Sequence, residues 1–167
     1  APGWVLGQRG RNPGEGIGFI ERIDARKHLT DWNQPGFDDS AWAAADVIGT
    51  QPTAPWVNAP QPDYTRIVEK EIAPASIKSI GEHAYLVDLG KVYAGTPRIA
   101  FTGGEAGQLV TMMGGYMLNA EGRVDPTKNQ GANLGFFAEL SGSAFTYAPI
   151  EYVGMRYLQI ENSPMPI

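Results

Sequence analysis

Residues 18–42 read GFIERIDARKHLTDWNQPGFDDSAW, and this stretch holds the pattern from which the fold is predicted. Its first part alternates apolar and polar residues with the period of two that is typical of a β-strand. A turn signal follows at residues 34–36, and two aromatic residues then enclose Asp38 and Asp39. Aspartate is favoured in Asx turns and at helix N-caps, so we expect these carboxylates to shape a turn.

The same alternation recurs along most of the chain, between turns rich in glycine, proline and asparagine. No stretch has the 3.6-residue periodicity of a long amphipathic helix. The sequence therefore predicts an all-β fold, a jelly-roll β-sandwich of two antiparallel sheets with little helix. The expected strands are Trp4–Leu6, Ile17–Ile23, Thr65–Ile72, Ala84–Leu89, Arg98–Thr102, Leu109–Met113, Phe136–Leu140 and Met155–Ile160.

Composition narrows the class of protein. With 167 residues and 43% hydrophobic content, we expect a single domain over residues 1–167 that buries a real core. The net charge of −5 disfavours nucleic acid and anionic membrane surfaces as partners, and favours a neutral or cationic ligand. No apolar run approaches the ~20 residues that a membrane helix needs. The absence of cysteine excludes disulfides, cysteine-ligated zinc and a thiol nucleophile.

Familiar catalytic patterns are missing from the sequence. There is no G-x-S-x-G nucleophile elbow and no phosphate-binding glycine loop. The two histidines, His28 and His83, lack a second histidine at metal-ligand spacing, so a zinc site is not expected. Among 18 acidic residues some glycosidase-like pair can always be named, which gives such a pair no weight. We expect a protein that is not an enzyme.

A group of charged residues in and just after the strand expected at Ile17–Ile23 is the first candidate binding site. In a regular strand Asp24 and Arg26 share one face, where a carboxylate and a guanidinium could hold the vicinal hydroxyls of a sugar. The alternative is a cross-strand ion pair on a solvated face. Glu21 is expected on the inner face, where a carboxylate needs a partner, whether an arginine, a cation or a ligand.

The second candidate is the segment from Thr50 to Tyr64, which contains four prolines. Proline fixes φ and removes a donor, so we expect a long ordered loop, and loops of this length are usually functional. Trp56 and Tyr64 could stack on a sugar face or anchor the loop to the core, and both interpretations stay open. Calcium prefers carboxylate, amide and carbonyl oxygens, which here could come from Asp24, Asn58 and Asp63.

Several short motifs occur along most of the chain: Ile23-Asp24-Ala25-Arg26, Pro35–Trp42, Val87–Gly90 with Ala94-Gly95, Met117–Gly122, Tyr147, Pro149 and Gly154–Leu158. In sequence and in order, they resemble the non-catalytic β-domain of bacterial and fungal α-L-rhamnosidases. The resemblance implies a jelly-roll module upstream of an (α/α)₆-barrel catalytic domain. Only ten residues follow Tyr157, so the barrel and its hydrolytic activity are not expected here.

The same region is similar to the rhamnose-binding carbohydrate-binding modules of family sixty-seven, which implies recognition of terminal L-rhamnose with the help of calcium. Asp24 stands at the acidic position of that pattern, and Ala25 replaces a frequent asparagine. We therefore expect a secreted or extracellular module that binds L-rhamnose or a rhamnose-containing glycan. The two candidates are expected to form one site, in which Asp24, Arg26 and Asn58 hold the sugar hydroxyls and Trp56 or Tyr64 contacts an apolar face. The expected sugar-binding residues are Glu21, Asp24, Arg26, Asn58, Trp56 and Tyr64.

Two other functions remain open at this point. The chain could be a structural domain that packs against a catalytic barrel and binds no sugar. Residues 135–140 and the strand end with Met112 and Met113 are the candidates for the exposed apolar patch of such a domain. It could also be a small polysaccharide-active enzyme that uses Tyr64, Arg26 and an acid.

Overall fold

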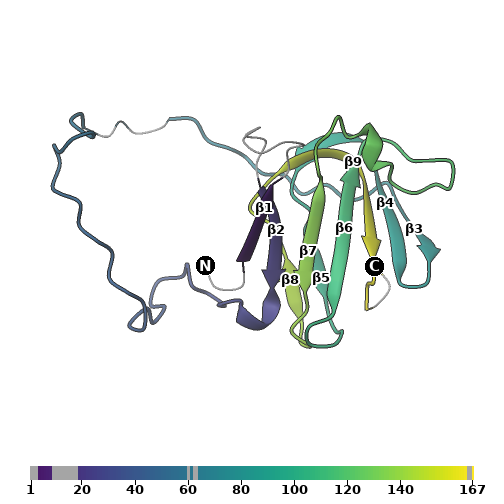
Figure 1. Cartoon of the computed structure of the whole chain (residues 1–167), viewed down its shortest axis with the longest axis horizontal. Helices are drawn as coiled ribbons and strands as arrows, with labels where there is room; N and C mark the ends of the chain where they lie inside the picture. The colour runs from purple at the N-terminus through teal and green to yellow at the C-terminus, as the bar shows by residue number, and fades with distance from the viewer. Residues whose placement is uncertain (1–3, 9–18, 60, 62–63, 165–166) are drawn as a thin grey trace. The chain divides into compact units, whose positions relative to one another are not determined.

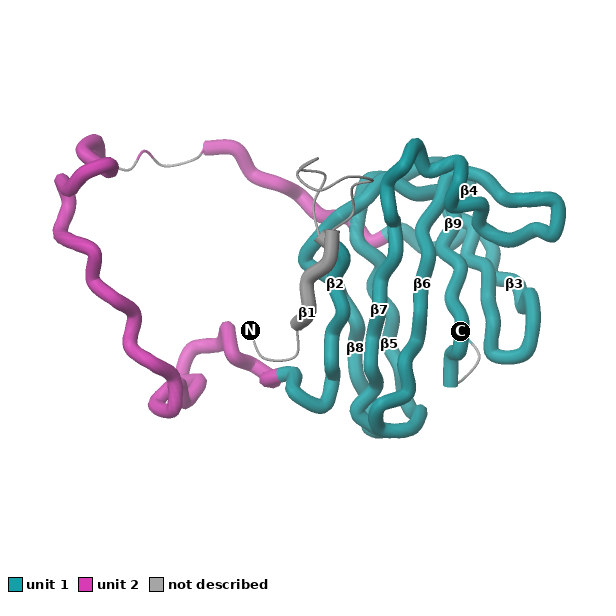
Figure 2. The backbone as a smooth tube through the Cα atoms, in the orientation of Figure 1, with its two compact units in different colours: residues 1–28, 72–167 teal, residues 29–71 magenta. Residues whose placement is uncertain are grey.

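The structure is a computed structural model, and it describes residues 4–8, 19–59, 61, 64–164 and 167. The chain divides into two compact units, with Ala1–His28 and Ile72–Ile167 in unit 1 and Leu29–Glu71 in unit 2 (Figure 2). All the strands of the described residues lie in unit 1. The expectation of one domain over residues 1–167 stays a prediction.

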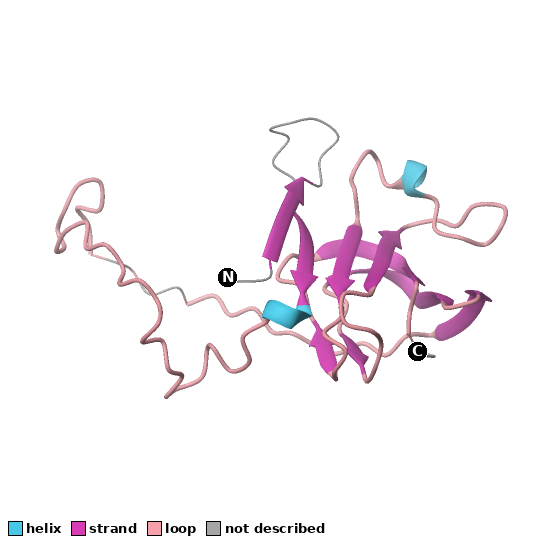
Figure 3. Cartoon of the chain, turned by 60° about the horizontal axis from the view of Figure 1, so that its bottom comes forward, coloured by secondary structure: helices cyan, strands magenta, loops and turns pink. Residues whose placement is uncertain are grey.

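Strands dominate unit 1, and the helical segments of the described chain are two single 3₁₀ turns (Figure 3). No helix there has the length and apolar character that crossing a membrane requires. The elements in order are β1 (Trp4–Gln8), β2 (Phe19–Asp24), η1 (Ala25–Lys27), β3 (Ser76–Gly81), β4 (Ala84–Gly95), β5 (Ile99–Phe101), β6 (Leu109–Gly115), η2 (Pro126–Lys128), β7 (Gly135–Glu139), β8 (Phe145–Tyr147) and β9 (Val153–Glu161).

The strands form a seven-stranded sheet, in the order β1-β2-β7-β6-β9-β4-β3, and a two-stranded sheet of β5 and β8 (Figure 1). This confirms the predicted all-β sandwich. The sheets are antiparallel except at one pair, because β2 runs parallel to β7. A parallel pair needs a long connection rather than a hairpin, and the chain between these two strands includes all of unit 2.

The core lies between the two sheets. Side chains alternate along the central strands, so that Val110 and Met112 on β6 are buried while Thr111 between them is partly exposed. Phe101 of β5 and Tyr147 of β8 belong to the same buried cluster, which joins the small sheet to the large one. Met112 therefore has the core role that is the default for a buried methionine.

Two of the sequence predictions are wrong. The strand expected at Thr65–Ile72 is not formed, and Ile67 in its middle is 92% exposed, since unit 2 contains no sheet to pair with it. The apolar patch expected at residues 135–140 is not on the surface. Of its apolar side chains, Phe136, Ala138 and Leu140 are fully buried and Phe137 is partly exposed, because one face of β7 packs in the core.

Candidate functional site

Asp24 and Arg26, the first predicted sugar-binding pair, bind each other. Asp24 ends β2 and caps η1, where its Oδ1 accepts the backbone N–H of Arg26 at 3.1 Å. The Arg26 guanidinium then donates to both carboxylate oxygens, with Nε–Oδ1 and Nη2–Oδ2 distances of 2.8 Å. This bidentate geometry is the strong form of the arginine–carboxylate interaction.

Glu139 on β7 extends this pair into a network. The parallel register places Glu139 opposite Asp24, and Arg26 Nη2 donates to Glu139 Oε2 at 2.6 Å. Arg22 donates to the other oxygen of Glu139. Two neighbouring carboxylates are thus balanced by two guanidinium groups. An ion pair is therefore present, as in the alternative that the sequence left open, but Asp24 and Arg26 pair within one turn rather than across strands, and Asp24 is buried. Sugar binding by Asp24 and Arg26 stays a prediction.

A calcium ion does not fit these surroundings of Asp24. Both carboxylate oxygens accept from Arg26, and the Lys27 ammonium lies 3.6 Å from Oδ2, so positive charge already surrounds the group. No group of three or more metal-ligating side chains occurs in the part of the chain that the structure describes. Of the other predicted ligands, Asn58 lies in unit 2 and Asp63 lies outside the described residues.

The ion pair should make stability depend on pH in a defined window. The hydrogen bonds from Arg26 lower the pKa of Asp24 from 3.8 to about 2. Since the folded-state pKa is depressed, the stabilisation is complete above pH ~4 and is lost as pH falls towards ~2. We expect Asp24→Asn to lower the free energy of unfolding at pH 7 by about 1–2 kcal/mol and to flatten its decrease below pH ~4.

Urea unfolding of both proteins at a series of pH values checks this expectation, with Asp39→Asn as the matched control. A pH dependence in the Asp24→Asn variant as steep as in the unsubstituted chain would exclude the assigned role of the pair.

Glu21 has the partner that its inward position requires. The side chain is 1% exposed, and its oxygens accept the backbone N–H groups of Ile150 at 3.0 Å and of Glu151 at 2.5 Å. The carboxylate therefore fixes the connection between β8 and β9. The partners of Glu21 are backbone amides, which were not among the partners expected from the sequence. Both carboxylate oxygens of Glu21 accept hydrogen bonds from this backbone.

In unit 2, Asp38 forms the turn that was predicted after the Pro-Gly dipeptide. Asp38 Oδ1 accepts from Ser40 N at 3.0 Å, which makes the expected Asx turn. Hydrogen bonds from the side chain and then the backbone of Ser40 lower the pKa of the Asp38 carboxyl. The two flanking aromatics, Phe37 and Trp42, contact each other with ring centroids 5.6 Å apart.

The proline-rich loop folds back on itself within unit 2. Thr53 N donates to Trp56 O at 3.2 Å, and Val57 N donates to Pro55 O at 3.1 Å. The Gln51 side-chain amide donates to the backbone carbonyl of Asn58. These contacts close residues 49–58 around a hollow of about 530 Å³, which we call the proline-loop hollow. Its walls are formed by Gly49, Gln51, Thr53, Pro55, Trp56, Val57 and Asn58.

The proline-loop hollow contains two of the six predicted sugar-binding residues. Trp56, whose side chain is 57% exposed, and Asn58 line it, whereas Tyr64 lies elsewhere in unit 2. The sequence analysis missed Gln51 and Thr53, although both flank prolines of the same loop. The charged residues Glu21, Asp24 and Arg26 belong to unit 1.

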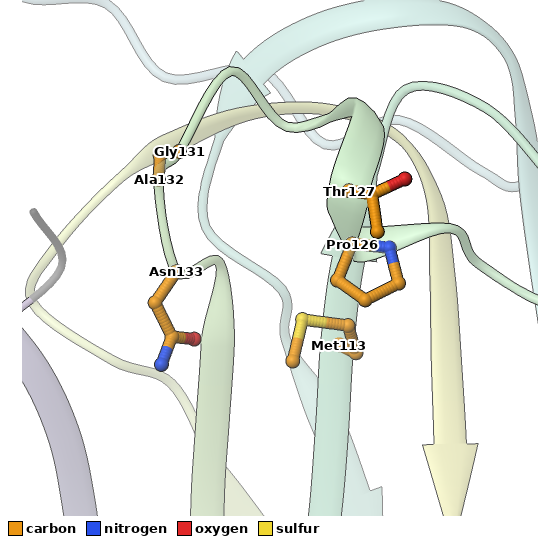
Figure 4. A pocket seen from close by; sticks show the side chains of 6 residues that line it. All are labelled: Met113, Pro126, Thr127, Gly131, Ala132 and Asn133. Atoms are coloured by element: carbon orange, nitrogen blue, oxygen red, sulfur yellow. The ribbon is translucent and has the colours of Figure 1, made fainter. Parts of the chain in front are cut away.

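A second hollow, of about 410 Å³, lies in unit 1 between β6 and the loop that contains η2 (Figure 4). We call it the η2 hollow. Nothing in the sequence analysis singled it out, because its walls come from β6 and from two separate parts of the long loop that follows β6. The lining residues are Met113, Pro126, Thr127, Gly131, Ala132 and Asn133.

Comparisons with known proteins bear on the fold and the family. The chain is 30% identical over 146 residues to an alpha-L-rhamnosidase of Streptomyces avermitilis, covering 86% of this chain and 14% of that protein. The chain therefore spans about one-seventh of the length of this curated relative.

Solved structures give the same indication. A Streptomyces avermitilis alpha-L-rhamnosidase complexed with L-rhamnose matches with a TM-score of 0.70 and 28% identity, over 88% of this chain and 14% of that one. An alpha-L-rhamnosidase from Dictyoglumus thermophilum matches with a TM-score of 0.64 and 23% identity, over 90% of this chain and 17% of that one, and supports the fold alone.

Residues 78–166, which all lie in unit 1, match a family model described as the bacterial alpha-L-rhamnosidase concanavalin-like domain. The match covers the greater part of the β-sandwich and more than half of the chain. The resemblance inferred from the short motifs is thereby confirmed: this chain belongs to the bacterial alpha-L-rhamnosidase concanavalin-like domain family.

Proposed function

We propose that this chain is a non-catalytic carbohydrate-binding module of a rhamnosidase-type protein, and that the proline-loop hollow holds L-rhamnose or a terminal rhamnosyl residue. The observation that carries the proposal is the exposed indole of Trp56 at a hollow that Asn58 and Gln51 also line.

The chemistry of the lining fits a neutral deoxy sugar. An indole face suits the C–H face of a pyranose ring, and the rings of Trp56 and Pro55 suit the methyl group at C6 of rhamnose. Side-chain amides and the Thr53 hydroxyl offer donors and acceptors for sugar hydroxyls. No charged residue lines the hollow. We expect a dissociation constant in the millimolar to micromolar range, equivalent to roughly 4–8 kcal/mol.

The comparisons support the ligand class and the non-catalytic role. A relative with 28% identity and a TM-score of 0.70 is described as complexed with L-rhamnose. The family model that matches this chain is a concanavalin-like domain. Association with the catalytic part of a larger rhamnosidase is therefore included in the proposal.

Trp56→Ala should weaken L-rhamnose binding at least tenfold, because a central aromatic anchor contributes about 2 kcal/mol or more. Isothermal titration calorimetry with L-rhamnose measures the change. Trp32→Ala is the matched control, since Trp32 is an exposed tryptophan of unit 2 that does not line the hollow. No heat from the unsubstituted chain, or equal affinity of the Trp56→Ala variant, would refute the assigned site.

The same titration in calcium and in a chelator tests the calcium expectation. Because the Asp24 carboxylate accepts from Arg26, we expect equal affinity in both conditions. A large loss of affinity in chelator would assign calcium a role that the contacts of Asp24 do not explain.

A second candidate function is a packing module that binds no sugar. It is favoured by the connection between β8 and β9, where Glu21 fixes the backbone while Ile150 and Tyr152 are 77% and 71% exposed. Exposed apolar side chains on a fixed backbone suit contact with another domain. Absence of heat with any sugar, together with self-association in light scattering that Tyr152→Ser abolishes, would favour this function.

A further inference from the structure

We infer that the η2 hollow is a second glycosyl-binding site, for a neutral deoxy sugar ring such as that of L-rhamnose. The ligand class rests on the proposed function. The site itself is independent of it, because the η2 hollow lies in unit 1 and shares no residue with the proline-loop hollow.

Residues of β6 and of the loop that contains η2 form the walls of the η2 hollow. Figure 4 shows Pro126 and Thr127 of η2 on one side, the residues from Gly131 to Asn133 on the other, and Met113 of β6 below them. Its volume of about 410 Å³ is within the range of ~300–1,000 Å³ that small-molecule sites usually occupy.

Buried hydrogen bonds form the hollow before any ligand arrives. Asn129 is 1% exposed, and its Nδ2 donates to Gly114 O at 3.0 Å, which ties the loop to β6. The loop also closes on itself, since Asn129 N donates to Pro126 O at 3.2 Å and Ala132 N donates to Asn129 O at 2.9 Å. A preformed site avoids much of the entropic loss of ordering a loop on binding.

Glycine at position 115 allows this close approach of loop and strand. A Cβ atom at Gly115 would lie 2.4 Å from Cγ1 of Val124, a distance that real Cβ atoms do not reach. The side chain of Asp125 then fixes the start of η2, because it accepts from Thr127 N at 3.0 Å and from Thr127 Oγ1 at 2.6 Å. The loop segment that forms the hollow is therefore held at Asp125, before η2, and at Asn129, after η2.

The lining divides into apolar and polar parts. Met113, Pro126 and Ala132 offer apolar contact suited to a ring face or a methyl group. Asn133 adds an amide whose Oδ1 accepts from Gly135 N at 2.9 Å, which sets the orientation of the group. No charged side chain lines the η2 hollow, so a charged ligand would find no counter-ion there and a neutral one is favoured.

The test is a titration of the isotope-labelled full chain with L-rhamnose to roughly 50 mM, well above a millimolar dissociation constant, followed by backbone amide chemical shifts. We expect saturable shifts at residues 126–133 and at Met113. Ala132→Phe fills the hollow and should abolish these shifts while those at residues 49–58 remain. Trp56→Ala should weaken at least tenfold the binding that the shifts at residues 49–58 report, and should leave the shifts at residues 126–133 unchanged.

Two further variants keep the test decisive. Ala120→Phe adds the same side chain at an exposed position of the same long loop and should leave all shifts unchanged. Asn133→Asp keeps the acceptor for Gly135 N and removes the amide donor, so it should weaken the site roughly three- to tenfold even if Ala132→Phe does not fold.

The outcomes separate the two proposals. Shifts at residues 49–58 without shifts at 126–133 overturn the second site and leave the proposed function standing. Shifts at 126–133 that persist in the Ala132→Phe variant, or that titrate with unchanged affinity in the Asn133→Asp variant, also overturn it. Shifts at 126–133 without shifts at 49–58 support the second site and refute the first.

Discussion

Phe101→Ala is expected to lower the free energy of unfolding of the β-sandwich by about 3–5 kcal/mol, the usual loss for a large aromatic side chain in a core. Phe101 is 1% exposed on β5 and belongs to the buried cluster that contains Tyr147 of β8. The two strands have three residues each, and an isolated two-stranded ribbon is marginal in water. The small sheet therefore depends on side-chain burial rather than on its own hydrogen bonds.

Urea unfolding monitored by circular dichroism measures this loss. Since the free energy of unfolding of a domain is usually about 5–15 kcal/mol, the Phe101→Ala variant should unfold at a clearly lower urea concentration than the unsubstituted chain. Phe37→Ala is the control, because Phe37 is a partly exposed residue of unit 2 whose ring contacts Trp42, and its loss should change stability by less than about 1 kcal/mol. Equal midpoints for the Phe101→Ala variant and the unsubstituted chain would contradict the packing role.

Strands with one face in the core could be predicted from the sequence. The alternation of Val110 and Met112 with partly exposed neighbours is the pattern that burial imposes on β6. The strands that were missed have weaker signals: β3 is an edge strand with serine, lysine and glycine, and β8 has three residues. Residues 65–72 alternate apolar and polar side chains but form no strand. Such alternation does not ensure that a neighbouring strand is present to pair with the segment.

Local features of the sites were also predictable, and long-range contacts were not. Trp56 and Asn58 lie in one proline-rich loop, so their shared hollow follows from nearby residues. Arg26 meets Glu139 across 113 residues of sequence, and no periodicity reveals such a contact. The η2 hollow depends on Asn129 reaching Gly114, which is likewise invisible in a local pattern.

The largest effect expected from a single charged residue is that of Glu21→Ala. Removal of this buried carboxylate leaves the amides of Ile150 and Glu151 without their acceptor, and we expect a loss of about 2–4 kcal/mol in the free energy of unfolding. Glu21→Gln keeps one acceptor oxygen in nearly the same shape, so its loss should be about 1–2 kcal/mol. Urea unfolding at neutral pH measures both variants.

Amide hydrogen exchange gives the specific readout for Glu21. If the carboxylate holds the connection between β8 and β9, exchange at Ile150 and Glu151 should accelerate by roughly tenfold or more in the Glu21→Ala variant, beyond the change at distant amides. Glu82→Ala is the control, because the Glu82 side chain is 93% exposed and an exposed ion pair contributes little. Destabilisation without faster exchange at these two amides would show that burial of Glu21, and not its bonds to this connection, stabilises the fold.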